Sequence, residues 1–264
     1  MVDQVLVAPR AKAISWQLAT VVGTSIETPH ARTLLLQVPE WRGHRPGQHV
    51  DVRLTSEDGY QTERSYSIAS PPEESPVALT VERLDEGEVS PYLTDVLHVG
   101  DQLELRGPIG GYFVWHIVVG GPLLLVAGGS GIVPLMAMLR HRAIVLETAD
   151  ARVRHNIPAR LLYSARRWED IFYRSELTRL AGNDETFEVD FTLTREAPEG
   201  WNGFHRRIDR MMLSEIAWPP GERPHVFVCG PTPLVESVAT ELVELGHDPA
   251  LVKTERFGPT GGSA

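Results

Sequence analysis

The sequence predicts a two-domain protein, with an N-terminal antiparallel six-stranded β-barrel followed by a C-terminal α/β domain whose parallel sheet binds a nucleotide. The 264 residues suffice for two hydrophobic cores. Up to about residue 117, short alternating apolar runs are separated by turn residues, as in antiparallel strands. After Gly120, continuous apolar runs alternate with helical spacing, as in a doubly wound sheet. We place the domains at residues 14–117 and 118–264.

The barrel strands are predicted from runs bounded by Pro-Gly, Asp-Gly, Pro-Pro and Gly-Pro pairs. One short helix is predicted at residues 90–98, with Ser90 as N-cap and Pro91 at the first helical position. Six strands with a single short helix favour a small barrel. The six predicted strands are residues 33–38, 49–54, 64–69, 77–84, 101–107 and 111–118.

Three strand–helix pairs define the predicted α/β domain. The first strand, residues 122–128, is apolar throughout, which indicates burial on both faces. The segment that follows has its apolar residues at helical spacing. Repeated strand–helix units predict a parallel sheet. The pairs are residues 122–128 with 131–145, 159–165 with 170–181, and 225–230 with 233–246.

Composition excludes several classes of protein. A formal net charge of -10 argues against nucleic-acid binding. The single cysteine, Cys229, excludes a disulfide framework and an iron–sulfur cluster held by this sequence's own thiolates. The ten histidines show no ligand spacing, so no metal site is predicted. Without a signal-like segment or an apolar run of membrane-spanning length, we expect a cytoplasmic protein with no membrane contact.

The strand segment RSYS places a cation and an aromatic ring on one face. Side chains two residues apart in a strand point the same way, about 7 Å apart. Arg64 offers a planar fork for phosphate oxygens and Tyr66 a flat ring for stacking, while Ser65 and Ser67 face the other side. From these residues alone, an ordinary solvent-facing strand is an equally good interpretation.

A second candidate phosphate site lies at residues 86–93, EGEVSPYL. Gly87 permits close backbone approach, and Val89 and Ser90 lead into the predicted helix. Free N–H groups at a helix start bind anions. Helix capping by Ser90 is the simpler alternative.

The segment GGSGIVP at residues 128–134 joins the first α/β strand to its helix. Three glycines in four residues allow a sharp turn and leave amides open to a pyrophosphate at the helix start. The spacing differs from G-x-G-x-x-G, so that fingerprint is not assigned. We predict a nucleotide site at this end of the sheet.

The next two strand ends carry further candidates. Ser164, Arg166 and Arg167 lie where an adenosine ribose would bind, and arginine there accommodates a 2′-phosphate, which favours NADPH over NADH. Alternatively, the arginines pair with Glu169 or Asp170 at a solvated helix start. Cys229 ends the following strand, where a lone cysteine is most often a small core residue, and Thr232 is a possible cap of the helix that follows.

In this order the motifs resemble those of the ferredoxin–NADP⁺ reductase family. RSYS resembles its R-x-Y-S/T flavin signature, GEVS its flavin-pyrophosphate segment, GGSGIVP its G-G-x-G-x-x-P loop and VCGP its C-G-P turn. PGQHVDV and GPIGGYF also match family segments. The resemblance runs from Trp16 to Phe257, and six motifs in order make it highly specific.

The resemblance implies an FAD on the barrel, with FMN less favoured, and NADPH or NADH on the α/β domain. It implies hydride transfer across the cleft, with Ser67, Cys229 and Glu255 as catalytic residues. Ser67 would lie near the reactive flavin nitrogen, Cys229 near the nicotinamide, and Glu255 where the chain closes over the flavin. The implied cofactor-binding residues are Arg64, Ser65, Tyr66, Ser67, Glu82, Arg83, Gly87, Glu88, Val89, Ser90, Gly129, Ser130, Gly131, Ser164, Arg166, Arg167, Tyr173, Cys229, Gly230, Pro231 and Phe257.

The leading functional hypothesis is an FAD-dependent NAD(P)H oxidoreductase that passes electrons to a separate acceptor, a ferredoxin or an oxygenase component. With one cysteine, we expect no fused [2Fe–2S] domain. Two alternatives stay open: a two-electron reductase of free flavin or quinone-like molecules, and a non-catalytic electron-transfer or nucleotide-sensing subunit. Residues proposed to steer an acidic ferredoxin are Arg10, Lys12, Arg32, Arg42 and Arg45.

Overall fold

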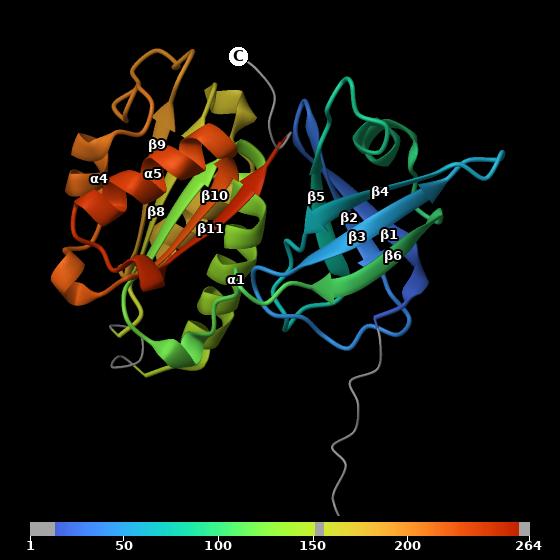
Figure 1. Ribbon diagram of the computed structural model, residues 1–264, viewed down its shortest axis with the longest axis horizontal. Coiled ribbons are helices and arrows are strands. Elements are labelled where there is room, and N and C mark those ends of the chain that lie inside the picture. Colours follow the sequence, from blue (N-terminus) through green and yellow to red (C-terminus); the bar gives the residue numbers. More distant parts are fainter. Residues whose placement is uncertain (1–13, 151–155, 259–264) are drawn as a thin grey trace, which may run out of the picture.

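The computed structural model describes residues 14–150 and 156–258 as two sheet-based domains lying side by side (Figure 1). The N-terminal sheet has the order β4-β3-β6-β1-β2-β5. An isolated bridge between Ile68 and Leu79 joins its two outer strands, so the sheet closes into a barrel. The predicted six-stranded antiparallel barrel is thereby confirmed. Its strands are β1 (Trp16–Thr28), β2 (Ala31–Gln37), β3 (His49–Thr55), β4 (Gln61–Ser67), β5 (Val77–Glu82) and β6 (Gln102–Ile109).

Two details of the barrel differ from prediction. The first strand, β1, was not predicted, and the strand predicted at residues 111–118 does not form. Phe113 and Trp115 in that segment are buried for another reason: Phe113 packs edge-on against Phe227 and Trp115 against His141, both in the other domain. The apolar run therefore serves domain packing rather than sheet pairing.

The helix predicted at residues 90–98 is only a π-helical turn, Tyr92–Val96. Ser90 does not cap it. Its hydroxyl instead accepts a hydrogen bond from the Leu84 N–H at 3.0 Å, which closes a tight loop together with the bond from Gly87 N–H to the Leu84 carbonyl at 2.9 Å. The side chain that was expected to start a helix thus shapes the preceding loop.

The second domain contains a five-stranded parallel sheet in the order β11-β10-β7-β8-β9. The predicted parallel α/β domain is confirmed. The predicted boundary at residues 117–118 falls in the link between β6 and β7, which contains a 3-10 turn at Ile117–Val119. The strands are β7 (Leu123–Gly128), β8 (Ala159–Ala165), β9 (Phe187–Leu193), β10 (His225–Pro231) and β11 (Val252–Phe257).

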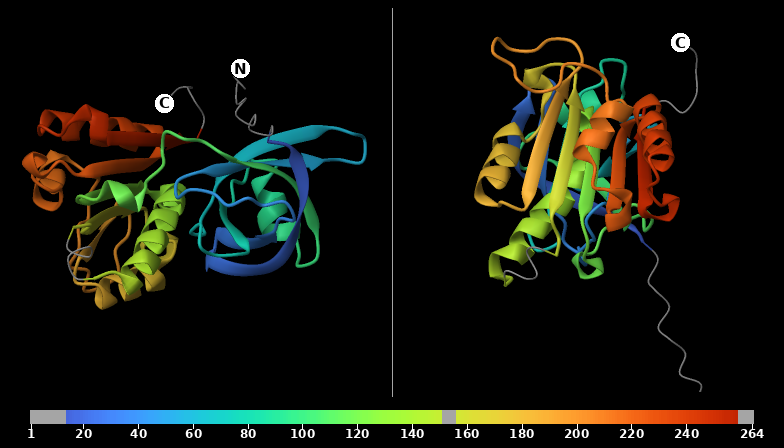
Figure 2. Two further views of the ribbon diagram at one scale, coloured as in Figure 1. Left: turned by 90° about the horizontal axis from the view of Figure 1, so that it is seen from below. Right: turned by 90° about the vertical axis from the view of Figure 1, so that its left-hand side faces the viewer.

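Helices cover both faces of this sheet (Figure 2). On one face, α4 (Arg210–Ile216) and α5 (Thr232–Glu244) share a core with β7 and β10. On the other, α1 (Ile132–Thr148) and α3 (Arg174–Asn183) share a core that extends to Ala69 and Ala78 of the barrel. No side chain caps α5, so Thr232 lacks the predicted capping role. Because α1 lies on the face of the sheet toward the barrel, the hydrophobic core around this helix also joins the two domains.

Candidate active site between the two domains

The carboxyl ends of β7 and β10 lie side by side where the strand order of the parallel sheet reverses. The chain runs from β7 outward to β8 and β9, then returns to β10 on the other side of β7. Ligands of open α/β sheets bind in the crevice at such a switch point. The GGSG loop follows β7, and the Cys229–Pro231 turn ends β10, so two predicted motifs meet here.

Glycine is required where these two motifs touch. A Cβ at Gly131 would lie 2.1 Å from the Cys229 carbonyl oxygen, so only glycine lets the loop rest against β10. Gly129 has a φ of +53° and open space where a Cβ would stand. No side chain caps the start of α1. A backbone cradle with an uncapped 17-residue helix behind it suits a pyrophosphate.

The three predicted catalytic residues come together from both domains. Ser67, at the end of β4, donates a hydrogen bond from its hydroxyl to Glu255 Oε1 at 3.4 Å. Glu255 pairs in register with Cys229 across β11 and β10. Residues far apart in the sequence therefore form one cluster where the barrel meets the parallel sheet.

Burial sets the protonation of this cluster. It raises the pKa of Glu255 to about 7, opposed by the hydrogen bond from Ser67. Burial, together with the nearby Glu255 charge, raises the pKa of the Cys229 thiol well above its ordinary value. Cys229 is fully buried and stays a neutral thiol near neutral pH, so it is a packing group rather than a nucleophile.

Arg64 and Tyr66 project from β4 as predicted from their spacing. The Arg64 side chain is 56% exposed, and its guanidinium donates to the Glu63 carbonyl oxygen at 2.7 Å. Tyr66 packs partly buried against the barrel core, and burial raises its pKa to about 12, so it stays a neutral phenol. Ser65 donates instead to Asp51 at 2.7 Å on the opposite face.

The 84–90 loop reaches the same strand. Glu88 lies 3.8 Å from Arg64 Nη2 and accepts a hydrogen bond from Thr62 at 3.2 Å. A carboxylate does not suit a phosphate, and the Gly87 N–H already donates to the Leu84 carbonyl oxygen, so the backbone amides of Glu88–Ser90 are the groups that a phosphate would use. Val89 is buried in the barrel core. The structure thus brings together the two segments predicted to hold a flavin phosphate.

Of three further predicted cofactor residues, two have side-chain partners elsewhere in the protein. Arg83 bonds to Asp95 at 2.8 Å and pairs also with Asp85. Glu82 ends β5 in register with Ala31. Tyr173 is buried, and its hydroxyl donates to Thr80 of the barrel. Arg83 and Tyr173 are therefore engaged in contacts within the protein, and their role in cofactor binding stays a prediction.

The ends of β8 and β9 carry the predicted ribose site. Ser164 is buried, while Arg166 is exposed and forms no ion pair with any described residue. Arg167 pairs with Glu196 at 3.2 Å, not with Glu169 or Asp170. Of the two predicted arginines, Arg166 is the one open to a phosphate.

Sequence reasoning missed Thr194 and Arg195, which follow β9 at the same edge. Their N–H groups donate to the carbonyl oxygens of Ala165 and Arg166 at 3.0 and 2.9 Å. Arg195 is exposed and, like Arg166, forms no ion pair within the described ranges. The sequence contained a signal for them, because a Thr-Arg pair that directly follows the strand next to β8 must lie at the same edge of the sheet as the end of β8.

These residues fit the two cofactors. The cradle at Gly129–Gly131 and the free guanidinium of Arg166 suit a phosphorylated nucleotide, and Arg64 with the Glu88–Ser90 amides suits a second pyrophosphate. The neutral phenol of Tyr66, on the same strand as Arg64, offers an aromatic face. Phe257 ends β11 in register with Pro231, beside the cluster of Ser67 and Glu255.

Comparison with known proteins agrees with this geometry. Residues 19–114 match the oxidoreductase FAD-binding domain, and residues 125–240 match the oxidoreductase NAD-binding domain. The chain belongs to the ferredoxin–NADP⁺ reductase-like family of flavoprotein oxidoreductases, which use FAD and a nicotinamide nucleotide.

Among curated relatives, the glycine betaine monooxygenase reductase subunit of Chromohalobacter salexigens is 33% identical over 82% of this chain and 56% of its own length. The NADH-cytochrome b5 reductase 1 of Aspergillus terreus is 31% identical over 77% of this chain and 68% of its own length. The chain thus spans little more than half of the first relative.

Among solved structures, the flavohem-like FAD/NAD-binding domain of nitric oxide dioxygenase from Vibrio cholerae superposes with a TM-score of 0.78 at 22% identity. The match covers 92% of this chain and 98% of that one. At this identity it supports the fold alone.

Proposed function

We propose that the protein is an NAD(P)H reductase that takes two electrons from a nicotinamide nucleotide and delivers them to a separate one-electron acceptor protein. The observation that carries this proposal is the hydrogen bond from Ser67 of the barrel to Glu255 of the parallel sheet, beside Cys229. It brings the flavin-side strand and the nucleotide-side turn to one point, as direct transfer between two bound cofactors requires.

FAD, when bound, supplies the conversion between two-electron and one-electron chemistry that no side chain here provides. The protein's own residues bind the two cofactors and orient them. Arg64 and the Glu88–Ser90 amides bind phosphate, while Tyr66 supports the flavin ring. The Gly129–Gly131 cradle and the Arg166 guanidinium hold the nucleotide, and an open Arg166 favours NADPH. Ser67 presents a hydroxyl oriented by Glu255.

The acceptor we propose is an oxygenase component or another small redox protein with an acidic surface. Relatives named as a monooxygenase reductase subunit and a cytochrome b5 reductase support this class. Arg42 and Arg45 are exposed, form no ion pair with a described residue, and line a hollow of about 290 Å³. Arg32 lies near Asp95, and Arg10 and Lys12 lie outside the described residues. Two free arginines on an acidic protein would steer an acidic partner.

The proposal is tested by mixing FAD-loaded protein anaerobically with NADPH or NADH, following the flavin absorbance, and then adding a one-electron acceptor protein. We expect rapid bleaching and reoxidation by the acceptor. Ser67→Ala should slow bleaching by roughly 10- to 100-fold, since hydride transfer depends on alignment. Arg166→Ala should weaken the binding of NADPH more than the binding of NADH. If neither nucleotide bleaches the flavin, the protein is not a reductase.

A further inference from the structure

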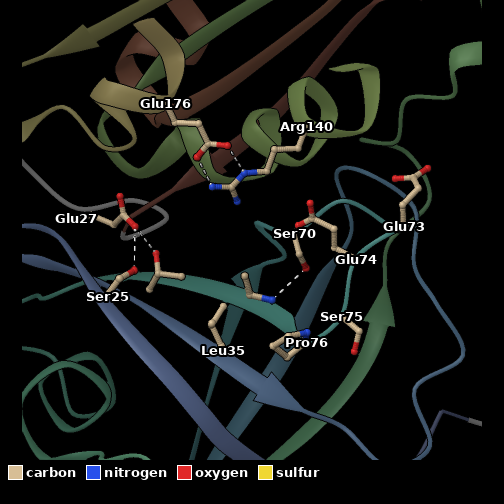
Figure 3. Close-up of a pocket in the computed structure, with 12 residues that line it drawn as sticks. Ser25, Glu27, Leu35, Ser70, Glu73, Glu74, Ser75, Pro76, Arg140 and Glu176 are labelled. Atoms are coloured by element: carbon tan, nitrogen blue, oxygen red, sulfur yellow. Dashed lines mark hydrogen bonds and ion pairs between the residues drawn. The ribbon is translucent and has the colours of Figure 1, made fainter. Parts of the chain in front are cut away.

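Arg140 joins three parts of the molecule. Its Nη1 donates to the backbone oxygen of Ala69 at 2.8 Å, and Ala69 lies two residues after Ser67. Its Nε and Nη2 donate to the two carboxylate oxygens of Glu176 at 2.9 and 2.6 Å (Figure 3). One guanidinium on α1 therefore holds α3 and the end of the flavin-side strand together. Such a bidentate fork also fixes direction, which a lysine cannot do.

Tyr173 makes a second link beside the first. The Arg140 guanidinium lies over its ring at 4.9 Å, and its hydroxyl bonds to Thr80 on β5. Thr80 in turn shares a hydrogen bond of 2.7 Å with Thr33, which donates to Glu27 at 2.8 Å. A buried polar chain thus runs from the start of α3 into the barrel.

The backbone of Tyr173 is held in an unfavourable conformation. Its φ and ψ are 55° and 21°, the left-handed region, which costs a bulky residue about 1–2 kcal/mol. Such conformations persist where surrounding contacts fix them, and they concentrate at functional sites. Here the ring is fixed between Arg140 and Thr80.

Next to these contacts, the two domains form a cleft. A cleft of about 710 Å³ is lined by Ser25, Glu27 and Glu74 of the barrel, and by Arg140 and Glu176 of the α/β domain (Figure 3). Leu35 and Ala78 also line the cleft, and Ala78 belongs to the hydrophobic core that α1 shares with the barrel. The contacts of Arg140 and Tyr173 therefore add directed polar links to the apolar packing between the domains.

We propose that Arg140 and Tyr173 are positioning residues that set the alignment of the nicotinamide with the flavin; this rests on the proposed function. The helix α1 starts at the nucleotide cradle, and Arg140 lies roughly 12 Å further along its axis. Because a helix is stiff over this length, fixing Arg140 to Ala69 fixes the cradle relative to Ser67. Both side chains are engaged with protein groups of the two domains, so each acts through the placement of the domains.

The test uses Arg140→Lys and Tyr173→Phe in the FAD-loaded protein, with Arg210→Lys as the matched control. Arg210 also pairs with a glutamate, Glu244 at 2.7 Å, but it links α4 to α5 within one domain. Stopped-flow reduction over a range of nucleotide concentrations separates the Kd for the nucleotide from the limiting rate. The long-wavelength absorption of stacked nicotinamide and flavin rings reports their alignment.

For Arg140→Lys we expect a Kd within about twofold of wild type, a limiting rate lower by roughly tenfold or more, and weaker long-wavelength absorption. Tyr173→Phe should shift the rate and absorption in the same direction by a smaller factor, and Arg210→Lys should match wild type. If Arg140→Lys fails to fold, the limiting rate and the absorption of Tyr173→Phe test the positioning role alone. Variants that bind and react like wild type would overturn the positioning role alone. A wild type that neither nucleotide reduces would overturn the reductase proposal as well.

Discussion

At the scale of the residue, Glu255 is the group of this site that titrates near neutral pH. Its pKa of about 7 results from burial, with the Ser67 hydroxyl acting in the opposite direction. Motif resemblance indicated the position of Glu255, but not its protonation, because burial depends on how Ser67 and Cys229 approach from separate segments. The same holds for Ser90 and Tyr173, whose partners Leu84 and Thr80 no local pattern reveals.

The limiting rate of flavin reduction should fall as pH rises through about 7. A carboxylate beside the flavin opposes the arrival of the negative charge that hydride carries, whereas the neutral acid does not. Glu255→Gln should remove this inflection and keep the rate of the low-pH form. Stopped-flow rates from pH 5.5 to 8.5 check this, and an unchanged inflection in the variant would assign it to another group.

The stability of the folded protein should also depend on the protonation of Glu255. Because the pKa of Glu255 is higher in the folded protein than its ordinary value of 4.5, the folded state holds this proton more tightly than the unfolded chain. This contribution to stability is complete below about pH 4.5 and is lost as pH rises through about 7. Glu255→Gln should therefore raise Tm more at pH 8 than at pH 5, and thermal unfolding at both pH values serves as a second readout of the titration.

At the scale of the element, the contact between the GGSG loop and the end of β10 determines the nucleotide side of the site. Hydrophobic runs predicted β7, β8 and β10, because strands buried on both faces leave continuous apolar segments. The same rule failed at residues 111–118, whose apolar side chains pack on the other domain. The helix predicted at residues 90–98 is longer than the observed turn, because the Ser90 hydroxyl accepts a hydrogen bond from a loop amide and does not cap the helix.

Gly131→Ala should lower the limiting rate of reduction by at least about tenfold. Its Cβ would stand 2.1 Å from the Cys229 carbonyl oxygen, so the loop must move away from β10 and the cradle moves with it. Gly182→Ala is the matched control, since it lies in α3 with nothing within 4 Å of the new Cβ. The control should keep the wild-type rate and gain roughly 0.5–1 kcal/mol of stability. Equal rates in both variants would show that the loop contact is dispensable.

At the scale of the whole molecule, the two domains meet at a shared apolar core, at the Ser67–Glu255 cluster and at the polar contacts of Arg140. The order of strand patterns predicted the barrel and the parallel sheet, because periodicity of two and strand–helix alternation are local signals. How the two domains sit together was not predictable in this way, since the Arg140–Ala69 and Ser67–Glu255 bonds join residues 71 and 188 positions apart. Among the described residues, no helix has both the length and the apolar character to cross a bilayer.

In the proposed reaction, a nucleotide on the α/β domain reacts directly with a flavin on the barrel. Single-turnover reduction of the FAD-loaded protein by NADPH deuterated at the transferred C4 position tests it most directly. We expect a primary isotope effect on the limiting rate for one C4 stereoisomer and none for the other, because the nicotinamide is held with a single face toward the flavin. Equal rates for both stereoisomers and for unlabelled nucleotide, or no reduction at all, would contradict it.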